Sequence, residues 1–311
     1  MDPLTDALAI AGVRSTLGAK IEAGRNWGWW WSSRSGELGA AFHAVTSGTV
    51  WVAVPGGDAV ELMPGDVILL PRGTPHAIGS DLQAVQRTNA DRFDTGEAVG
   101  DGVHRMGTGD TRSQLLCAHY TQDAAVHTQV LSLLPDVVHV RAGAAHGLGA
   151  LVGLIADELV RPGLASDVVL NRLVDVLLVR VLRSWVEQAP TGDLTGSSWL
   201  TGLRDPIVHA ALTELHAEPG RAWTADTLAQ AVAVSRATLT RRFASAAGET
   251  PGAYLLRWRM DLAARRLRDT DDAIGTIGRD LGYTSEPAFN RAFSRARDVP
   301  PGRYRTLSRA A

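Results

Sequence analysis

The stretch Leu228-Ala229-Gln230-Ala231-Val232-Ala233-Val234-Ser235, followed directly by Arg236-Ala237-Thr238-Leu239-Thr240-Arg241-Arg242-Phe243, decides the fold of the last hundred residues. A second copy of the pattern runs from Ile277 to Ser285 and continues as Glu286-Pro287-Ala288-Phe289-Asn290-Arg291-Ala292-Phe293. In each copy a short helix ends at a tight turn, and a serine caps a second helix that carries core phenylalanines. This is the layout of a helix-turn-helix, whose second helix, the recognition helix, lies in the DNA major groove. Two such units in tandem predict an all-α domain that binds double-stranded DNA.

The outward positions of the two recognition helices are the candidate DNA contacts. Apolar residues repeat at i and i+4 in both helices and are predicted to pack inward, which leaves the intervening residues exposed. Arginine can pair with guanine, asparagine with adenine, and threonine suits thymine or phosphate. The candidates are Arg236, Thr238, Thr240 and Arg241 in the first helix and Ser285, Glu286, Asn290 and Arg291 in the second.

The segment between the two units predicts one continuous helix from Pro251 to Asp269. At ~1.5 Å per residue such a helix is about 28 Å long. It would hold the two recognition helices about one DNA turn apart, which is roughly 34 Å. One monomer could therefore contact two adjacent segments of the major groove.

Charge is distributed unevenly along the chain, although the whole protein carries only −2. From Arg204 to Ala311 there are 17 arginines and 12 Asp or Glu residues, a net charge of +5, while the preceding part carries −7. A basic C-terminal segment fits contact with phosphate, and an acidic N-terminal segment does not.

These features resemble the AraC/XylS-type DNA-binding domain. The resemblance implies a transcription regulator that carries a sensing domain ahead of the double helix-turn-helix, with RNA polymerase as a candidate partner. The matching pieces are Ser235 to Gly248, Pro251-Gly252-Ala253-Tyr254 with Arg259 and Ala263, Gly282-Tyr283, Phe289 to Phe293, and Pro301-Gly302-Arg303-Tyr304-Arg305.

Length and composition predict about two domains in a chain of 311 residues. No apolar run approaches the ~20 residues that a membrane span requires. The start of the sequence lacks the basic segment of a secretory signal, so we expect a cytoplasmic protein without a membrane partner. Cys117 is the only cysteine, which excludes an internal disulfide.

The N-terminal part predicts a β-barrel or jelly roll, so the whole chain is expected to be α+β. Short strands alternate with Gly- and Pro-rich turns, which is typical of such folds. The predicted strands are Val50–Val54, Val67–Leu70, Gln83–Gln86, Gln114–Tyr120 and Val137–Val140.

One stretch of this region, Gly65 to His76, resembles the second cupin motif. The first cupin motif should supply two histidines and a glutamate, but Phe42-His43-Ala44-Val45-Thr46-Ser47-Gly48 supplies one histidine only. The resemblance therefore implies a reduced cupin-type sensing domain, and the incomplete metal site counts against catalysis. The rival hypothesis is a cupin-type metal-dependent enzyme with an appended helical domain; an interaction protein that has lost DNA binding is a third.

The residues of this domain also suggest a different metal site. Cys117 and His119 share one face of a strand, and together with His43 and His76 they would supply a tetrahedral zinc set. Oxidation of the thiolate would then release the metal and act as a redox switch. The alternative is that Cys117 is a small buried hydrophobe and that the histidines bond to backbone groups.

The run Trp27-Gly28-Trp29-Trp30-Trp31 is the other unusual feature. As a strand it places Trp29 and Trp31 on one face, where they could form an aromatic wall for a planar small-molecule effector. Core filling or an interface is the interpretation that we favour.

The middle of the chain predicts helices from about residue 149 to Gln188, with apolar residues on more than one side. A helix of that kind must be buried on several faces, which predicts packing on the barrel and a homodimer interface. The predicted organisation is a sensor over 1–145, a helical dimerisation element over 148–189, a linker over 190–204 and the DNA-binding domain over 205–311.

Overall fold

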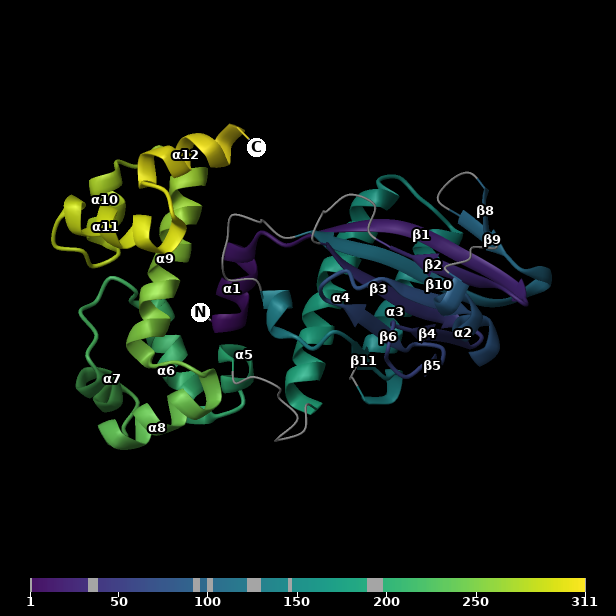
Figure 1. The fold of residues 1–311 in the computed structure, drawn as a ribbon, viewed down its shortest axis with the longest axis horizontal. Coiled ribbons are helices and arrows are strands. Elements are labelled where there is room, and N and C mark those ends of the chain that lie inside the picture. Colours follow the sequence, from purple (N-terminus) through teal and green to yellow (C-terminus); the bar gives the residue numbers. More distant parts are fainter. Residues whose placement is uncertain are drawn as a thin grey trace. The chain divides into compact units, whose positions relative to one another are not determined.

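The computed structural model describes residues 2–32, 39–91, 96–99, 103–121, 130–144, 147–188 and 198–310 (Figure 1). These residues form two compact units. One unit, called the sensor unit after the role predicted for it, contains residues 13–121 and 134–188, and the other, the helical unit, contains residues 2–12, 130–133 and 198–310. Residues 190–197 of the predicted linker and the predicted boundary at residue 145 lie outside the described residues. Within the described ranges, no helix has the length and hydropathy to cross a membrane.

Two β-sheets build the sensor unit. The larger sheet has the strand order β11-β6-β3-β10-β1-β9-β8, and the smaller has the order β2-β7-β4-β5. The strands are β1 Arg14–Arg25, β2 Gly28–Trp31, β3 Gly39–Ser47, β4 Val50–Ala53, β5 Val60–Leu62, β6 Val67–Leu70, β7 His76–Gly79, β8 Gly96–Val99, β9 Val103–Met106, β10 Thr108–Thr121 and β11 Val138–Val140. The prediction of an α+β fold with an N-terminal cupin-like domain is confirmed.

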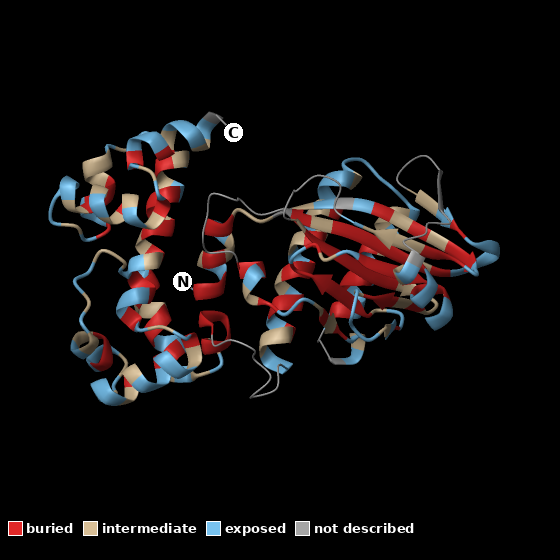
Figure 2. Ribbon diagram, in the orientation of Figure 1, coloured by how far each residue is buried: buried red, intermediate tan, exposed pale blue. Residues whose placement is uncertain are grey.

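The core of the sensor unit lies between the two sheets (Figure 2). Ile21 and Leu115 of the larger sheet and Val52 and Ile78 of the smaller one belong to a single buried cluster. Strand β6, whose sequence is Val-Ile-Leu-Leu, is buried at every position. A strand covered on both faces shows such a continuous apolar run.

The predicted strand at Gln83–Gln86 is wrong, because these residues lie in helix α2 (Leu82–Asp91). Asp81 accepts a hydrogen bond from the amide of Ala84 at 2.9 Å, which is the geometry of a helix N-cap. Ala84 and Val85 are buried, and α2 packs on strand β7. The cap and the buried pair outweigh the weak alternation of the sequence.

Helices α3 (Leu148–Val160) and α4 (Ser166–Gln188) complete the sensor unit and match the predicted helical segment. Helix α4 packs on β1 and β11, and the Tyr120 hydroxyl donates to the carbonyl of Val174 at 2.9 Å. Leu151 and Ile155 of α3 are buried, whereas Leu154 is 56% exposed.

The helical unit contains two helix-turn-helix pairs, α7–α8 and α10–α11, joined by the long helix α9 (Figure 1). Helix α9 spans Pro251–Asp269, as the sequence predicts. The other helices are α5 Trp199–Gly202, α6 Pro206–Ala217, α7 Ala225–Ala231, α8 Arg236–Ala247, α10 Ile274–Asp280, α11 Glu286–Arg297 and α12 Pro301–Ala310.

The first helix of the chain, α1 (Pro3–Ala11), belongs to the helical unit, although the sequence assigned residues 1–145 to the sensor. Asp2 caps it by accepting from the Thr5 amide, and Leu4 and Ile10 are buried. The helix packs against α6, α9 and the short 3-10 helix at residues 130–133. The apolar face of α1 is therefore buried against residues of the helical unit.

A buried polar cluster fixes α1 to its neighbours. His216 of α6 has its Nδ1 3.2 Å from Asp6 of α1 and its Nε2 2.6 Å from the hydroxyl of Tyr254 on α9. Its ring also stacks on Trp258, with 3.8 Å between centroids. This contact was not predicted, although Asp2 followed by Pro3 is a helix-start signal in the sequence.

Candidate functional site

The first recognition helix, α8, is held by its cap and by its buried face. The hydroxyl of Ser235 accepts from the amide of Thr238 at 3.2 Å, and the helix ends at Gly248, whose φ of 76° is left-handed. Leu239 and Phe243 are fully buried. This geometry directs the intervening side chains away from the core, as the spacing predicts.

The second recognition helix, α11, repeats this arrangement. Ser285 caps it by accepting from the Ala288 amide at 3.3 Å, and Phe289 and Phe293 are fully buried. The preceding turn needs Gly282, because its φ is +85° and a Cβ there would lie 2.4 Å from the carbonyl oxygen of Gly220.

Arg241 and Arg291 occupy equivalent positions, each six residues after the capping serine of its helix. Both are exposed, and neither forms an ion pair with a carboxylate within the described residues. Arg236 is also exposed, but it lies 3.3 Å from Asp226. Two unneutralised guanidinium groups at matching places are suited to an anionic partner or to guanine.

The remaining candidates are less free than the sequence suggests. The Thr238 hydroxyl is 2.9 Å from that of Ser235 and thus belongs to the cap, while Thr240 is half-buried. Ser285 uses its hydroxyl as a cap, and Glu286 is exposed.

Asn290 differs most from its expected outward orientation. It is partly buried, and its Oδ1 is buried without a hydrogen-bond partner in the described part of the chain. Bidentate pairing with adenine requires both the oxygen and the nitrogen of the amide. The side chain would have to rotate before it could make that contact.

The arginines of α9 bond to carbonyl and carboxylate groups within the helical unit. Arg259 donates to the carbonyls of Pro219 and Arg221 at 2.6 and 2.8 Å, which holds the loop after α6. Carboxylates pair with the others: Arg257 with Glu249, Arg265 and Arg268 with Asp269, and Arg266 with Asp272 and Asp280. The net positive charge of the linking helix is therefore largely neutralised.

In the sensor unit, three of the four predicted metal ligands meet in the core between the sheets. Strand pairing places His43 of β3 directly opposite Cys117 of β10, and His76 comes from β7 of the other sheet. His43 Nδ1 is 2.9 Å from Cys117 Sγ, and His43 Nε2 is 2.7 Å from His76 Nε2. All three residues are buried. We call this set the Cys–His–His cluster.

The hydrogen bonds of the Cys–His–His cluster run in one direction. His76 Nδ1 lies 2.7 Å from the carbonyl of Thr74, which can only accept, so the proton of neutral His76 is on Nδ1. His76 Nε2 then accepts from His43 Nε2–H, and His43 Nδ1 accepts from the thiol of Cys117. Every polar atom of the neutral cluster is satisfied in this way.

Burial keeps the cluster uncharged. It lowers the pKa of His43 well below the ordinary value, an effect to which the neighbouring His76 adds. It also lowers the pKa of His76 to about 4, against the opposing hydrogen bond to Thr74, and raises the pKa of the Cys117 thiol. The charged forms are disfavoured because the barrel interior solvates them poorly.

The predicted zinc set of four ligands is not assembled in this structure. His119 lies two residues after Cys117 on β10. In the described residues it forms no hydrogen bond to the Cys–His–His cluster. Across the described ranges no three His, Cys, Asp or Glu side chains converge as metal ligands would. The reason is that His43 directs its two nitrogens to different partners, so the cluster is a chain and not a shell.

Trp29 and Trp31, which share one face of strand β2, both make contacts within the protein. Trp31 stacks on His76 with 5.1 Å between centroids, and Trp29 stacks on His104 at 6.1 Å. Trp27, just before the strand, is fully buried. Ring contacts of this kind are expected from core filling, and the aromatic wall for an effector stays a prediction.

Comparison with known proteins agrees with both units. A cupin family model matches residues 2–187 and a helix-turn-helix domain model matches residues 228–306. A protein of Streptomyces antibioticus named as an AraC-like transcription regulator is 39% identical over 310 residues, which are 98% of each chain. The transcriptional regulator MtrA of Neisseria gonorrhoeae is 30% identical and covers 98% of this chain and 97% of its own.

Among solved structures, the DNA-binding domain of AdpA in complex with a target DNA is similar to part of the chain. It is 28% identical, covers 34% of this chain and 95% of its own, and has a TM-score of 0.32. The full-length relatives are named as regulators and not as enzymes. The chain therefore belongs to the AraC-like transcription regulators, with a cupin-type N-terminal domain and a C-terminal helix-turn-helix domain that binds DNA.

Proposed function

We propose that this regulator contacts its operator chiefly through Arg241 and Arg291, one from each recognition helix. The observation that carries the proposal is their equivalence: both lie six residues after a capping serine, both are exposed, and neither has a carboxylate partner in the described residues. Helix α9, which is ~28 Å long, separates the two recognition helices by about the distance between successive major-groove faces.

Binding to a DNA duplex selected from a random library tests this proposal. Arg241→Ala and Arg291→Ala should each lower specific affinity by about 1–3 kcal/mol and relax the sequence preference at one place in the site. Arg161→Ala is the charge-matched control, because this exposed arginine lies in the sensor unit. Unchanged affinity in both test variants would refute the assignment.

The signal, in this proposal, enters at the Cys–His–His cluster as a metal ion, with zinc as the probe. Imidazole nitrogen is a preferred ligand of zinc and copper. His43 and His76 present their Nε2 atoms to each other, while each Nδ1 is held by another group, namely Cys117 or the Thr74 carbonyl. Metal-bound histidines are usually oriented in this way through the second nitrogen.

Both donor atoms are of a type that zinc accepts, but only these two face each other, and the rings would have to separate slightly. Two Zn–N bonds of ~2.0–2.1 Å at a tetrahedral angle put the nitrogens about 3.3 Å apart, against 2.7 Å between His43 and His76. His43 would lose its Nε2 proton to solvent and take the thiol proton onto Nδ1. Cys117 would then be a thiolate that accepts from His43, with one proton released per ion.

A thiol oxidised directly, without metal, is the weaker form of this proposal. Cys117 is 5% exposed and its pKa is raised, so the neutral thiol dominates. The thiolate is the species that oxidants attack. Oxidation therefore depends on a prior event that deprotonates Cys117.

Elemental analysis and operator binding test the sensor proposal. We expect about one zinc per chain after loading under reducing conditions, its loss in His76→Ala, and its retention in the matched control His119→Ala. Cys117→Ser should weaken binding about 10–100-fold, as loss of an orienting partner does. Zinc should also change operator affinity, because a ligand shifts an equilibrium only by its differential affinity for two states. No zinc uptake would overturn the proposal and favour an organic effector.

We further propose a homodimer formed through α3 and α4. Leu154, Val160, Val168 and Val176 are 47–61% exposed, while the opposite side of α4 packs on the sheet. A second copy could cover these residues in a two-fold interface, in which the same patch is used twice. Light scattering of Val176→Lys should show a shift towards monomer, and an unchanged mass would contradict this interface. Contact with RNA polymerase stays a prediction from the resemblance.

A further inference from the structure

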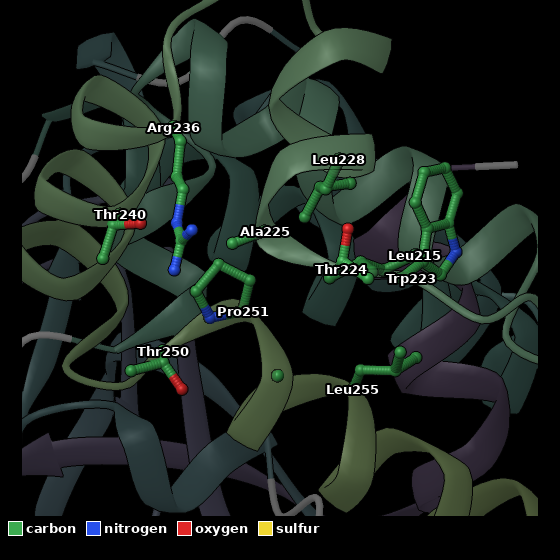
Figure 3. A pocket seen from close by; sticks show the side chains of 11 residues that line it. Leu215, Trp223, Thr224, Ala225, Leu228, Arg236, Thr240, Thr250, Pro251 and Leu255 are labelled. Atoms are coloured by element: carbon green, nitrogen blue, oxygen red, sulfur yellow. The ribbon is translucent and has the colours of Figure 1, made fainter.

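A partly open pocket of about 300 Å³ lies beside the first helix-turn-helix, lined by residues of α6, α7, α8, the segment before α7 and the start of α9 (Figure 3). It belongs wholly to the helical unit and is separate from the Cys–His–His cluster. Its lining residues are Leu215, Trp223, Thr224, Ala225, Leu228, Arg236, Thr240, Thr250, Pro251, Gly252 and Leu255. We call it the α8 pocket.

The α8 pocket has an apolar floor and a polar rim. Leu215, Leu228 and Leu255 are buried and supply the floor. Arg236 and Thr240 stand on α8, and Figure 3 shows the Arg236 guanidinium directed across the space towards Pro251. A site with an apolar body and a few convergent polar groups is typical of small-molecule binding.

The charge at the rim favours an anion. Arg236 is the only cation among the residues that line the pocket, and none of these residues is a carboxylate. Asp226 lies outside the lining and pairs with Arg236 at 3.3 Å, with the two side chains 69% and 66% exposed. Exposed pairs of this kind are weak, so a ligand carboxylate can replace Asp226 without a large loss.

The volume limits the size of the ligand. A water molecule occupies ≈30 Å³ in the liquid, so the pocket holds about ten heavy atoms. This is the lower end of the usual range for ligand sites, ~300–1,000 Å³. A short amphipathic acid matches both the volume and the division into floor and rim.

We propose that the α8 pocket binds a small monocarboxylate with an apolar body of about seven to nine carbons, and that this ligand competes with DNA. The carboxylate would pair with Arg236, with the Thr240 and Thr250 hydroxyls nearby, and the chain would lie on Leu215, Leu228 and Leu255. Competition follows because Arg236 and Thr240 belong to the recognition helix. This control acts on the DNA-binding unit directly, without passing through the sensor.

Octanoate is the probe, and binding to the full-length protein is measured first without DNA by calorimetry or ligand-observed NMR. Gly252→Phe should block the pocket, since a Cβ at this lining position meets nothing within 4 Å. Gly252→Ala is the matched control and should bind octanoate normally. Arg236→Gln should weaken octanoate about two- to fivefold, as expected for an exposed ion pair, while leaving binding of the uncharged analogue octanol unchanged.

The outcomes separate this proposal from the proposed function. Octanoate binding that is abolished by Gly252→Phe, together with a rise in the apparent Kd for DNA in the wild type, supports it. No octanoate binding, or equal loss in Gly252→Ala and Gly252→Phe, overturns it. Equal binding of octanol and octanoate overturns the role of Arg236. DNA binding through Arg241 and Arg291 is left standing by each of these failures, because the first measurement contains no DNA.

Discussion

Lowering the pH from 7 to 5 should destabilise the helical unit through one residue, His216. Its ring is buried between α1, α6 and α9, bonded to Asp6 and Tyr254 and stacked on Trp258. In this setting Nδ1–H donates to Asp6 and the Tyr254 hydroxyl donates to Nε2, so the neutral ring satisfies both partners.

The size of the effect follows from the pKa of His216, which is lowered from 6.5 to about 4. Burial is the main cause, and Arg257 adds to it, while Asp6 and Asp2 oppose it. Because the unfolded chain binds the proton more tightly, the stabilisation is complete above pH 6.5 and is lost as the pH falls towards 4. With these two values, the loss between pH 7 and pH 5 is about 2 kcal/mol.

Hydrogen exchange of peptides from α1 and α9 measures this loss locally, after correction for the intrinsic pH dependence of exchange. His216→Gln should remove most of the pH dependence, because glutamine can still bond to Asp6 and Tyr254 but does not titrate in this range. His209→Gln, an exposed position on the same helix, is the control and should retain it. Equal pH dependence in wild type and His216→Gln would refute the reasoning.

Three further predictions concern folding signals in the helical unit and are checked by chemical denaturation. Gly282→Ala should lower the free energy of unfolding by at least about 2 kcal/mol, because a left-handed φ costs ~1–2 kcal/mol and the new Cβ would lie 2.4 Å from a carbonyl oxygen. Gly302→Ala is the control, because its Cβ makes only an ordinary contact at 3.8 Å. Equal destabilisation by the two substitutions would contradict this prediction. Ser235→Ala should cost about 1 kcal/mol through loss of the cap, and Ser235→Thr should restore most of it. Phe243→Ala should cost about 3–5 kcal/mol, because the ring is fully buried; a cost below about 1 kcal/mol would show that the ring is not part of the core.

The DNA-binding domain could be predicted almost completely from the sequence, because its signals are local. Ser235, Gly248 and Gly282 mark helix starts and turns by their own chemistry, and they act as caps or left-handed residues in the structure. The i, i+4 repeat of Phe289 and Phe293 likewise identified a buried face. Cap and turn chemistry depends on a few neighbouring residues, so it can be recognised without tertiary information.

The packing of α1 and the geometry of the Cys–His–His cluster depend on contacts between distant residues. Helix α1 has a cap and an apolar stripe, but only tertiary packing decides that Ile10 is covered in the helical unit. His43 and Cys117 are 74 residues apart, and their meeting depends on the register of β3 and β10. Sequence could nominate these ligands, but not the direction in which the His43 ring points.

The ion pairs that the arginines of α9 form are a second feature that the sequence does not predict. A run rich in arginine indicates DNA contact, yet Arg266 binds Asp272 and Asp280, which lie beyond the end of its own helix. Removing one partner of such a network alters stability as well as charge. Variants of these arginines would therefore be poor tests of DNA contact.

The most direct test of the central claim is a missing-contact footprint of the full-length protein on its selected DNA site. Two patches of essential bases should appear about 10–10.5 bp apart on one face of the duplex. Arg241→Ala should erase the dependence on one patch, and Arg291→Ala the dependence on the other. A single patch, or the loss of the same patch in both variants, would contradict the claim that one chain places two recognition helices in successive major grooves.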